Sequence, residues 1–242
     1  MVASIVIDNG SYMCKAGFGG DYEERKVIPP FVGYRNLQSY LGPNPEFLVG
    51  EKAEKDKTLP NLQNPIKHGL ITDWGNMERI WQHAFDELNV AAEDSAVLLT
   101  EPVGNSEKNR EKMVKIMFKK FEVRAVMVAN QAALSLFDSG RVTGISVNVG
   151  HGITQVVPIY GASTIKGATF CQHQNITGLA LRDNLKNILT ERGYMFGNSM
   201  SDKRTLNVIK EKLCYVALDF EQEMQAAKSS KALEKSHEQS DG

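Results

Sequence analysis

Ile5-Val6-Ile7-Asp8-Asn9-Gly10-Ser11, near the start of the chain, is an apolar run that ends in an acid, an amide and a glycine. Such a run predicts a buried strand, and its glycine predicts a tight turn into a return strand at residues 14–18. Ile145-Ser146-Val147-Asn148-Val149-Gly150-His151 has the same order of residue types and is followed by a second return strand at residues 153–159. The two segments indicate an internal duplication, although two unrelated hairpins would produce the same pattern.

Apolar residues elsewhere recur at spacings of three and four, which is typical of helices with one buried face. Three helices are predicted on this basis, at residues 113–121 after a cap at Asn105-Ser106, at residues 181–192 before Gly193, and at residues 206–220. Strands are predicted between helices, at residues 96–100 and 125–128. The alternation of strands and helices predicts an α/β fold.

Composition and charge make several classes of protein improbable. The chain of 242 residues has 28 basic and 29 acidic side chains and a net charge of −1, so nucleic acid and anionic membrane surfaces are not expected partners. With 42% hydrophobic and 24% charged residues it has the composition of an ordinary globular protein. Its apolar runs, such as residues 97–99, fall far short of the roughly 20 residues that span a bilayer, so membrane insertion is not expected.

The cysteines favour a reducing compartment. Cys14, Cys171 and Cys214 are far apart and show no Cys-x-x-Cys spacing, which suits free thiols better than disulfides or zinc. The first residues lack the basic region of a signal peptide. A cytoplasmic location is therefore expected.

The first turn has the chemistry of a phosphate and metal site. Gly10 would let backbone amides approach an anion, Asp8 could hold a divalent cation through water, and Lys15 would add a positive charge beside a terminal phosphate. The second turn, Gly150-His151-Gly152, offers the same amide geometry. Two such turns facing each other would hold a polyphosphate, whereas either turn taken alone is explained as well by a plain hairpin.

A family resemblance rests on longer strings. Residues 6–11 and 13–18 closely resemble the first phosphate loop of actin, and matching strings continue at residues 65–69, 71–74, 97–101, 109–113, 188–194 and 209–224. The similarity extends from about residue 5 to residue 242. The sequence is therefore identified as a member of the actin family.

The resemblance implies an actin-like (ribonuclease H-like) α/β fold of two lobes, with ATP or ADP and Mg or Ca in the cleft between them. Residues 1–29 and 66–138 would form the first lobe, and residues 30–65 a subdomain inserted in it. Residues 139–174 would begin the second lobe, and residues 175–242 would belong to its insertion. Chains of the family continue beyond this point, so the second lobe is expected to be incomplete.

The resemblance also implies roles for single residues. Asp8 would hold the cation through its water shell, and Gln131 would orient the attacking water if hydrolysis is retained. Lys210 and Glu211 would lie beside the nucleoside. The residues implied to contact the phosphates are Gly10, Ser11, Lys15, Gly150 and Gly152.

Several positions depart from the family pattern. Tyr12 stands where the family has glycine; its ring needs space beside the phosphates, and tyrosine tolerates positive φ poorly. Asn148 and His151 replace two acids, and each lost charge-assisted contact to a cation weakens binding by about 1.5–3 kcal/mol. Gln155 replaces a histidine that helps to polarise the lytic water, and the loop at residues 36–47 is shorter and rewritten. Hydrolysis is therefore expected to be poor or absent.

Two functions remain open. The departures favour a divergent actin-related cytoskeletal protein that acts as a structural or scaffolding subunit and binds ATP weakly or without efficient hydrolysis. The alternative, supported by Asp8, Lys15 and Gln131, is a conventional ATP-hydrolysing filament former. In either case the expected partners are actin, actin-binding proteins or other cytoskeletal subunits, met in part at a groove around Phe137, Ser139, Gly140 and Arg141.

Overall fold

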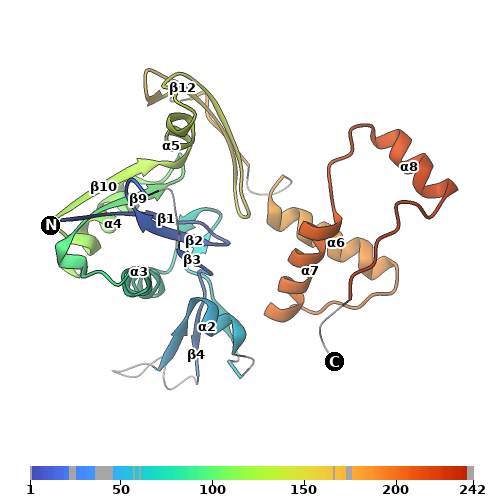
Figure 1. Ribbon diagram of the computed structural model, residues 1–242, viewed down its shortest axis with the longest axis horizontal. Helices are drawn as coiled ribbons and strands as arrows, with labels where there is room; N and C mark the ends of the chain where they lie inside the picture. The colour runs from blue at the N-terminus through green and yellow to red at the C-terminus, as the bar shows by residue number, and fades with distance from the viewer. Residues whose placement is uncertain are drawn as a thin grey trace. The chain divides into compact units, whose positions relative to one another are not determined.

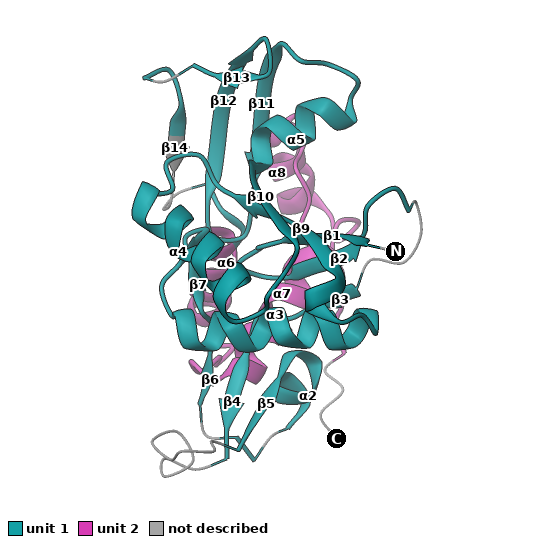
Figure 2. Ribbon diagram, turned by 90° about the vertical axis from the view of Figure 1, so that its left-hand side faces the viewer, with its two compact units in different colours: residues 1–178 teal, residues 179–242 magenta. Residues whose placement is uncertain are grey.

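The computed structural model describes residues 2–21, 26–35, 46–56, 58–59, 61–165, 167–172 and 176–238, and at Cys171 and Gln172 it describes the backbone alone. These residues divide into two compact units, residues 1–178 and residues 179–242, which are treated separately (Figure 2). The predicted insertion loop at residues 36–47 lies mostly outside the described residues. The subdomain boundaries implied by the resemblance stay predictions.

The first unit is organised around a five-stranded sheet with the order β10-β9-β1-β2-β3 (Figure 1). Its strands are β1 (Ala3–Asp8), β2 (Cys14–Phe18), β3 (Lys26–Ile28), β9 (Ser95–Glu101) and β10 (Ala125–Asn130). β2 is antiparallel to both β1 and β3, whereas β9 is parallel to both β1 and β10. The predicted strands and the first hairpin are confirmed. Because β1, β9 and β10 run in the same direction, their carboxyl ends meet at one edge of the sheet.

Two capped helices cover one face of this sheet: α3 (Trp74–Leu88) and α4 (Glu107–Lys119). Asp73 begins α3 by accepting a hydrogen bond from the Asn76 amide, and α3 ends at Asn89 in the left-handed conformation. Ser106 caps α4 through the Asn109 amide, so the predicted cap and helix are confirmed.

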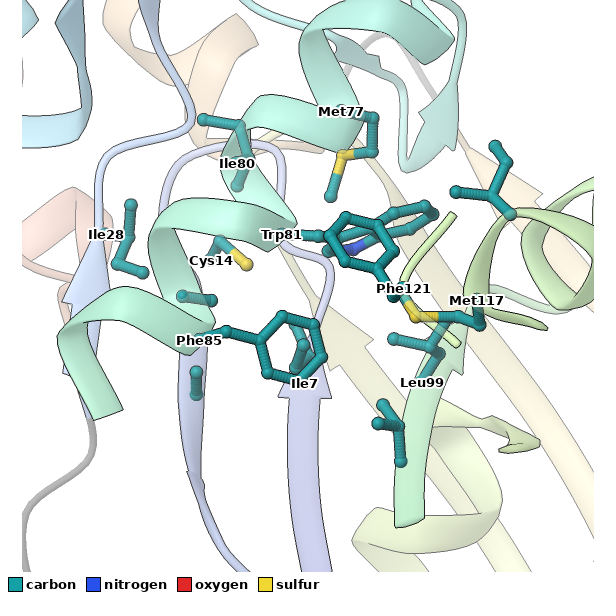
Figure 3. Packing of buried hydrophobic residues seen from close by; sticks show 14 of the residues in the cluster. Ile7, Cys14, Ile28, Met77, Ile80, Trp81, Phe85, Leu99, Met117 and Phe121 are labelled. Atoms are coloured by element: carbon teal, nitrogen blue, oxygen red, sulfur yellow. The ribbon is translucent and has the colours of Figure 1, made fainter. Parts of the chain in front are cut away.

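The core of the first unit lies between these helices and the sheet (Figure 3). Every second residue of β1 and β9 points toward the helices, which contribute large side chains at spacings of three and four. Trp81 of α3 is fully buried and lies edge-on to Phe121, with ring centroids 6.4 Å apart. The labelled members of the cluster are Ile7, Cys14, Ile28, Met77, Ile80, Trp81, Phe85, Leu99, Met117 and Phe121.

A second, antiparallel sheet follows in the same unit. It contains β11 (Gly144–Val149), β12 (Thr154–Tyr160), β13 (Ser163–Thr164) and β14 (Phe170–Gln172). Helix α5 (Gln131–Asp138) packs against it through Ala132 and Leu136, which meet Val157 and Ile159 in a separate small core. The β11–β12 pair confirms the second predicted hairpin.

Short elements complete the first unit. A three-stranded sheet, in the order β5-β4-β6, carries one helix, and a two-stranded sheet follows it. These elements and a 3-10 turn are β4 (Val32–Tyr34), β5 (Phe47–Val49), α2 (Gly50–Lys55), β6 (Leu62–Gln63), β7 (Ile66–Lys67), β8 (Leu70–Ile71) and η1 (Ala92–Asp94). The turn between β7 and β8 has left-handed backbone at His68 and Gly69.

The regular secondary structure in the described part of the second unit consists of three helices: α6 (Gly178–Glu191), α7 (Met200–Leu213) and α8 (Phe220–Ser229). The predicted single helix at residues 206–220 is wrong, because α7 ends at Leu213 and Cys214 is extended. Asp219 starts a new helix by accepting a hydrogen bond from the Gln222 amide. In the part of the chain that the structure describes, no helix combines the length and the apolar character needed to cross a bilayer.

Candidate functional site

The two glycine hairpins face each other across one pocket of about 680 Å³, a volume in the range of small-molecule sites. Asp8 of the first hairpin and Asn148 of the second both line it. Seven of the residues to which the resemblance gives a role in binding or hydrolysis lie on its wall: Asp8, Gly10, Ser11, Lys15, Gln131, Gly150 and Gly152. Their roles toward a ligand stay predictions.

The Asp8 carboxylate is held by one partner from the neighbouring parallel strand β9 and one from the start of helix α5. Thr100 at the end of β9 donates its hydroxyl to Asp8 Oδ1 at 2.7 Å, and Gln131 Nε2 at the start of α5 donates to the same oxygen at 2.9 Å. Gln131 Nε2 also lies 3.2 Å from Thr100 Oγ1. Hydrogen bonds to a carboxylate are stronger than neutral ones, so this triad fixes the only acid that the described residues place on the pocket wall.

Asn9 ties the first turn to the core. Its backbone amide donates to Thr100 Oγ1 at 3.0 Å, and its Nδ2 donates to the Thr100 carbonyl at 3.0 Å. The indole Nε1 of Trp81 donates to Asn9 Oδ1 at 3.0 Å. The position of the turn therefore depends on a buried helix residue that lies far from it in sequence.

The segment around β7 supports both hairpins. Asn64 Nδ2 donates to the Ser11 carbonyl at 2.7 Å. His68 Nδ1 lies 3.2 Å from the Gly152 carbonyl, and because a carbonyl oxygen only accepts, this nitrogen carries the proton. Gly152 is tightly placed: a Cβ there would come within 2.8 Å of Ser11 Oγ. The second hairpin therefore touches the first at Gly152.

The second hairpin supplies neutral groups where the first supplies a carboxylate. Asn148 Nδ2 donates to Ser146 Oγ at 3.2 Å, and the Ser135 hydroxyl lies 3.5 Å from Asn148 Oδ1. Gln155 is 2% exposed, and both ends of its amide meet the backbone of Val103: Nε2 donates to the carbonyl at 2.9 Å, and Oε1 lies 3.4 Å from the amide nitrogen. Gln155 therefore joins β12 to the turn after β9.

The prediction of backbone strain at Tyr12 is wrong. Tyr12 is not among the described non-glycine residues with positive φ, which are His68, Asn89, Glu122 and Ala162. The Tyr12 ring instead stacks on the His151 ring, with centroids 4.8 Å apart and planes inclined by 26°. The two side chains that depart from the family pattern at the turns thus contact each other.

Other predicted residues lie elsewhere. Lys15 is exposed on β2, directly opposite Asp8 in the antiparallel pair, and it lines the pocket. Lys210 and Glu211 belong to α7 of the second unit, and their implied place beside a nucleoside stays a prediction.

Sequence reasoning did not single out Thr100, Asn64 or His68 as parts of the site. The carboxyl end of the predicted strand at residues 96–100 was the available signal for Thr100, because neighbouring parallel strands end at the same edge. Asn64 and His68 gave no comparable signal.

The donor set suits a phosphate better than a bare cation. Gly10, Gly150 and Gly152 line the pocket, and among the described residues Lys15 is the only lysine or arginine on its wall. Within the described part of the chain, Asp8 is the only carboxylate of the pocket, and no group of three or more His, Cys, Asp or Glu is placed to hold a metal ion. A nucleotide would thus be held by the glycine turns and Lys15, with Asp8 as the one acid toward its cation.

Two glycine hairpins of related design, facing each other across a pocket on an α/β scaffold, define this as a protein with an actin-like fold. The chain also matches the family model described as Actin over residues 1–242, its whole length. It therefore belongs to the actin family.

Cys14, next to the site, is expected to resist thiol reagents while the protein is folded. Burial, together with the negative charge of Asp8, raises the pKa of its thiol to about 12, so the reactive thiolate is scarce at neutral pH. Cys214 is exposed. In a Cys171→Ser background, maleimide labelling at pH 7.5 (about one unit below the usual thiol pKa) followed by peptide mass mapping is expected to modify Cys214 alone, and Cys14 after urea is added. Equal labelling rates in the folded protein would contradict this.

Proposed function

We propose that this protein is a divergent actin-related cytoskeletal subunit with a structural or scaffolding role. It holds ATP or ADP weakly and hydrolyses ATP slowly or not at all. Its partners in this proposal are actin, actin-binding proteins or other cytoskeletal subunits, and its location is the cytoplasm and cytoskeleton. The observation that carries the proposal is the bonding of Gln155.

Gln155 stands where the family has a histidine that acts on the lytic water. A primary amide does not change charge near neutral pH, unlike an imidazole. Its two polar ends are engaged by the Val103 backbone inside the protein. Turning the amide toward a ligand would break both of its contacts with the Val103 backbone, and an intramolecular hydrogen bond contributes about 0.5–1.5 kcal/mol. Gln155 therefore serves the scaffold at the position where the family uses a histidine in the reaction.

The charge of the pocket supports the same proposal. Asp8 is the only carboxylate among the described residues of its wall, and Asn148 is neutral. Each missing charge-assisted contact lowers cation affinity by about 1.5–3 kcal/mol, which is about ten-fold to more than a hundred-fold. Weaker cation binding also weakens the binding of a nucleotide that carries the cation.

One observation favours the alternative, a conventional ATP-hydrolysing filament former. Gln131, the residue implied to orient the lytic water, projects into the pocket and is held by Asp8 and Thr100. If Gln131 retains this role, hydrolysis depends on it. The effect of a Gln131 substitution on ATP hydrolysis therefore distinguishes the two functions.

Phosphate release from Mg-ATP by the purified protein tests the proposal. We expect no release above the buffer rate, and no further loss on Gln131→Ala. A Gln155→His/Asn148→Asp variant restores a titratable group and a carboxylate, and it is expected to bind Mg-ATP at least ten-fold more tightly, the value of one recovered charge-assisted contact. Turnover by the unmodified protein that Gln131→Ala abolishes would overturn the proposal, as would its assembly into sedimenting filaments only when ATP is hydrolysed.

The proposed partner surface lies at the end of α5. Phe137 is exposed there, and the chain then turns through Gly140, which has positive φ and donates its amide to the Phe137 carbonyl at 2.8 Å. An exposed aromatic side chain on a rigid turn is a common anchor in protein interfaces. Co-sedimentation with actin filaments, compared with a Phe137→Ala variant, would measure its contribution.

A further inference from the structure

The Tyr12 and His151 rings join the two turns of the pocket. Tyr12 follows Ser11 in the first turn and His151 precedes Gly152 in the second, and both line the same cavity. Their centroids lie 4.8 Å apart and their planes are inclined by 26°. This is the stacked geometry in which aromatic side chains attract each other.

The backbone beneath the rings is also in close contact. Gly152 lies so near Ser11 that a Cβ would come within 2.8 Å of the Ser11 hydroxyl oxygen, and within 3.4 Å of His68 backbone. His68 donates to the Gly152 carbonyl, and Asn64 donates to the Ser11 carbonyl. The two turns are therefore positioned by the protein itself, and the ring pair lies between the segments whose amides would receive a phosphate.

We propose that the Tyr12–His151 stack determines the ligand specificity of this site. It takes the space of a phosphate group that would bridge both turns, and it holds the turns together as that phosphate would. Triphosphates and pyrophosphate bind only when the rings separate, whereas a ligand that contacts one turn is not penalised. This inference rests on the proposed function, since it explains at the level of two side chains why nucleotide is held weakly.

The size of the effect follows from the strength of an aromatic pair. In the unmodified protein a bridging phosphate must first separate the two rings. The free energy needed for this is expected to make binding about 2- to 10-fold weaker than it would be without the stack, the range of measured aromatic pairs. Removing the Tyr12 ring also opens space, so its effect is expected at the upper end of this range. The effect requires both rings, because either ring alone forms no stack.

Isothermal titration calorimetry with pyrophosphate and with Mg-ATP tests the inference. Tyr12→Gly and His151→Ala are each expected to raise affinity for both ligands by about 2- to 10-fold. The double variant is expected to gain little more than either single one, because the first change already breaks the stack. Tyr12→Phe keeps the ring and is expected to bind like the unmodified protein. Tyr160→Ala, which removes an exposed tyrosine outside the pocket, is the matched control.

Unchanged or weaker binding by both single variants would overturn the inference, as would fully additive gains in the double variant. The readout is binding, and Gln155 and Asn148 are untouched in every variant. Hydrolysis by the unmodified protein would therefore contradict the proposed function. The role of the stack would still be decided by the affinities of the variants relative to the unmodified protein. If the protein does not hydrolyse ATP and the variants bind with the same affinity as the unmodified protein, only the proposed role of the stack is contradicted.

A second readout is the melting temperature, measured without and with pyrophosphate. Without ligand, Tyr12→Gly and His151→Ala are each expected to melt below the unmodified protein, because the link between the turns is lost. Added pyrophosphate is expected to recover more of the melting temperature in these variants than it adds to the unmodified protein. If pyrophosphate raises the melting temperature equally in the unmodified protein and in both variants, the stack does not take the place of a phosphate.

Discussion

Replacing Trp81 with alanine is expected to lower the free energy of unfolding by about 3–5 kcal/mol. Trp81 is fully buried, packs against Phe121, and joins the core to the first turn through the hydrogen bond from its indole to Asn9. The substitution leaves a large cavity and removes the donor to a buried amide oxygen. Urea unfolding followed by circular dichroism would measure the change.

Two further tryptophan variants separate packing from hydrogen bonding. Trp81→Phe keeps most of the volume and removes the indole N–H, so a loss of about 1–3 kcal/mol is expected. Trp74→Ala is the matched control, because Trp74 is only partly buried and lies under the Lys112 ammonium at 4.9 Å. A loss below 1 kcal/mol for Trp81→Ala, or an equal loss for Trp74→Ala, would contradict the central place of Trp81.

Replacing Gly10 with alanine is expected to destabilise the first hairpin by about 1–3 kcal/mol and to disturb the pocket. A Cβ at Gly10 would overlap the Met13 carbonyl oxygen, which belongs to the backbone of the same turn. Backbone atoms in a tight turn cannot move aside as a flexible side chain can. The turn must therefore open, which shifts Ser11 and the contact with Gly152.

Gly17→Ala is the control for this prediction. Gly17 lies on β2 in the same hairpin, and a Cβ there would meet no heavy atom within 4 Å. Its replacement is expected to change stability by less than about 0.5 kcal/mol. Both variants are compared by urea unfolding, and equal losses would show that the close approach at Gly10 is relieved at no cost.

Much of the secondary structure follows from local patterns. The strands, the two hairpins and the cap of α4 were predicted, because alternation, glycine turns and Ser106 act over a few residues. The break between α7 and α8 was not predicted, and a single helix at residues 206–220 was expected instead, because apolar spacing persists across the break. Val216 fits the helical pattern yet is fully exposed, and Asp219 caps a new helix instead.

The candidate site was predicted only in part. Residues on the two turns could be paired because each turn carries its own motif. The hydrogen-bond partners of Asp8 could not be predicted, because Thr100 and Gln131 reach it only through the parallel register of β1, β9 and β10. The Tyr12–His151 stack joins residues from different hairpins, and each one alone reads as a simple departure from the family.

By itself the sequence determined the α/β class, the two glycine hairpins and membership of the actin family, because these depend on local spacing and on long ordered strings. Only the tertiary structure decided which groups meet at the pocket: a carboxylate held by one strand residue and one helix residue, an amide bound to backbone where a histidine is expected, and two stacked rings. Contacts between distant segments depend on strand register and packing, which no local pattern records. The chemistry of the site is therefore a property of the folded chain.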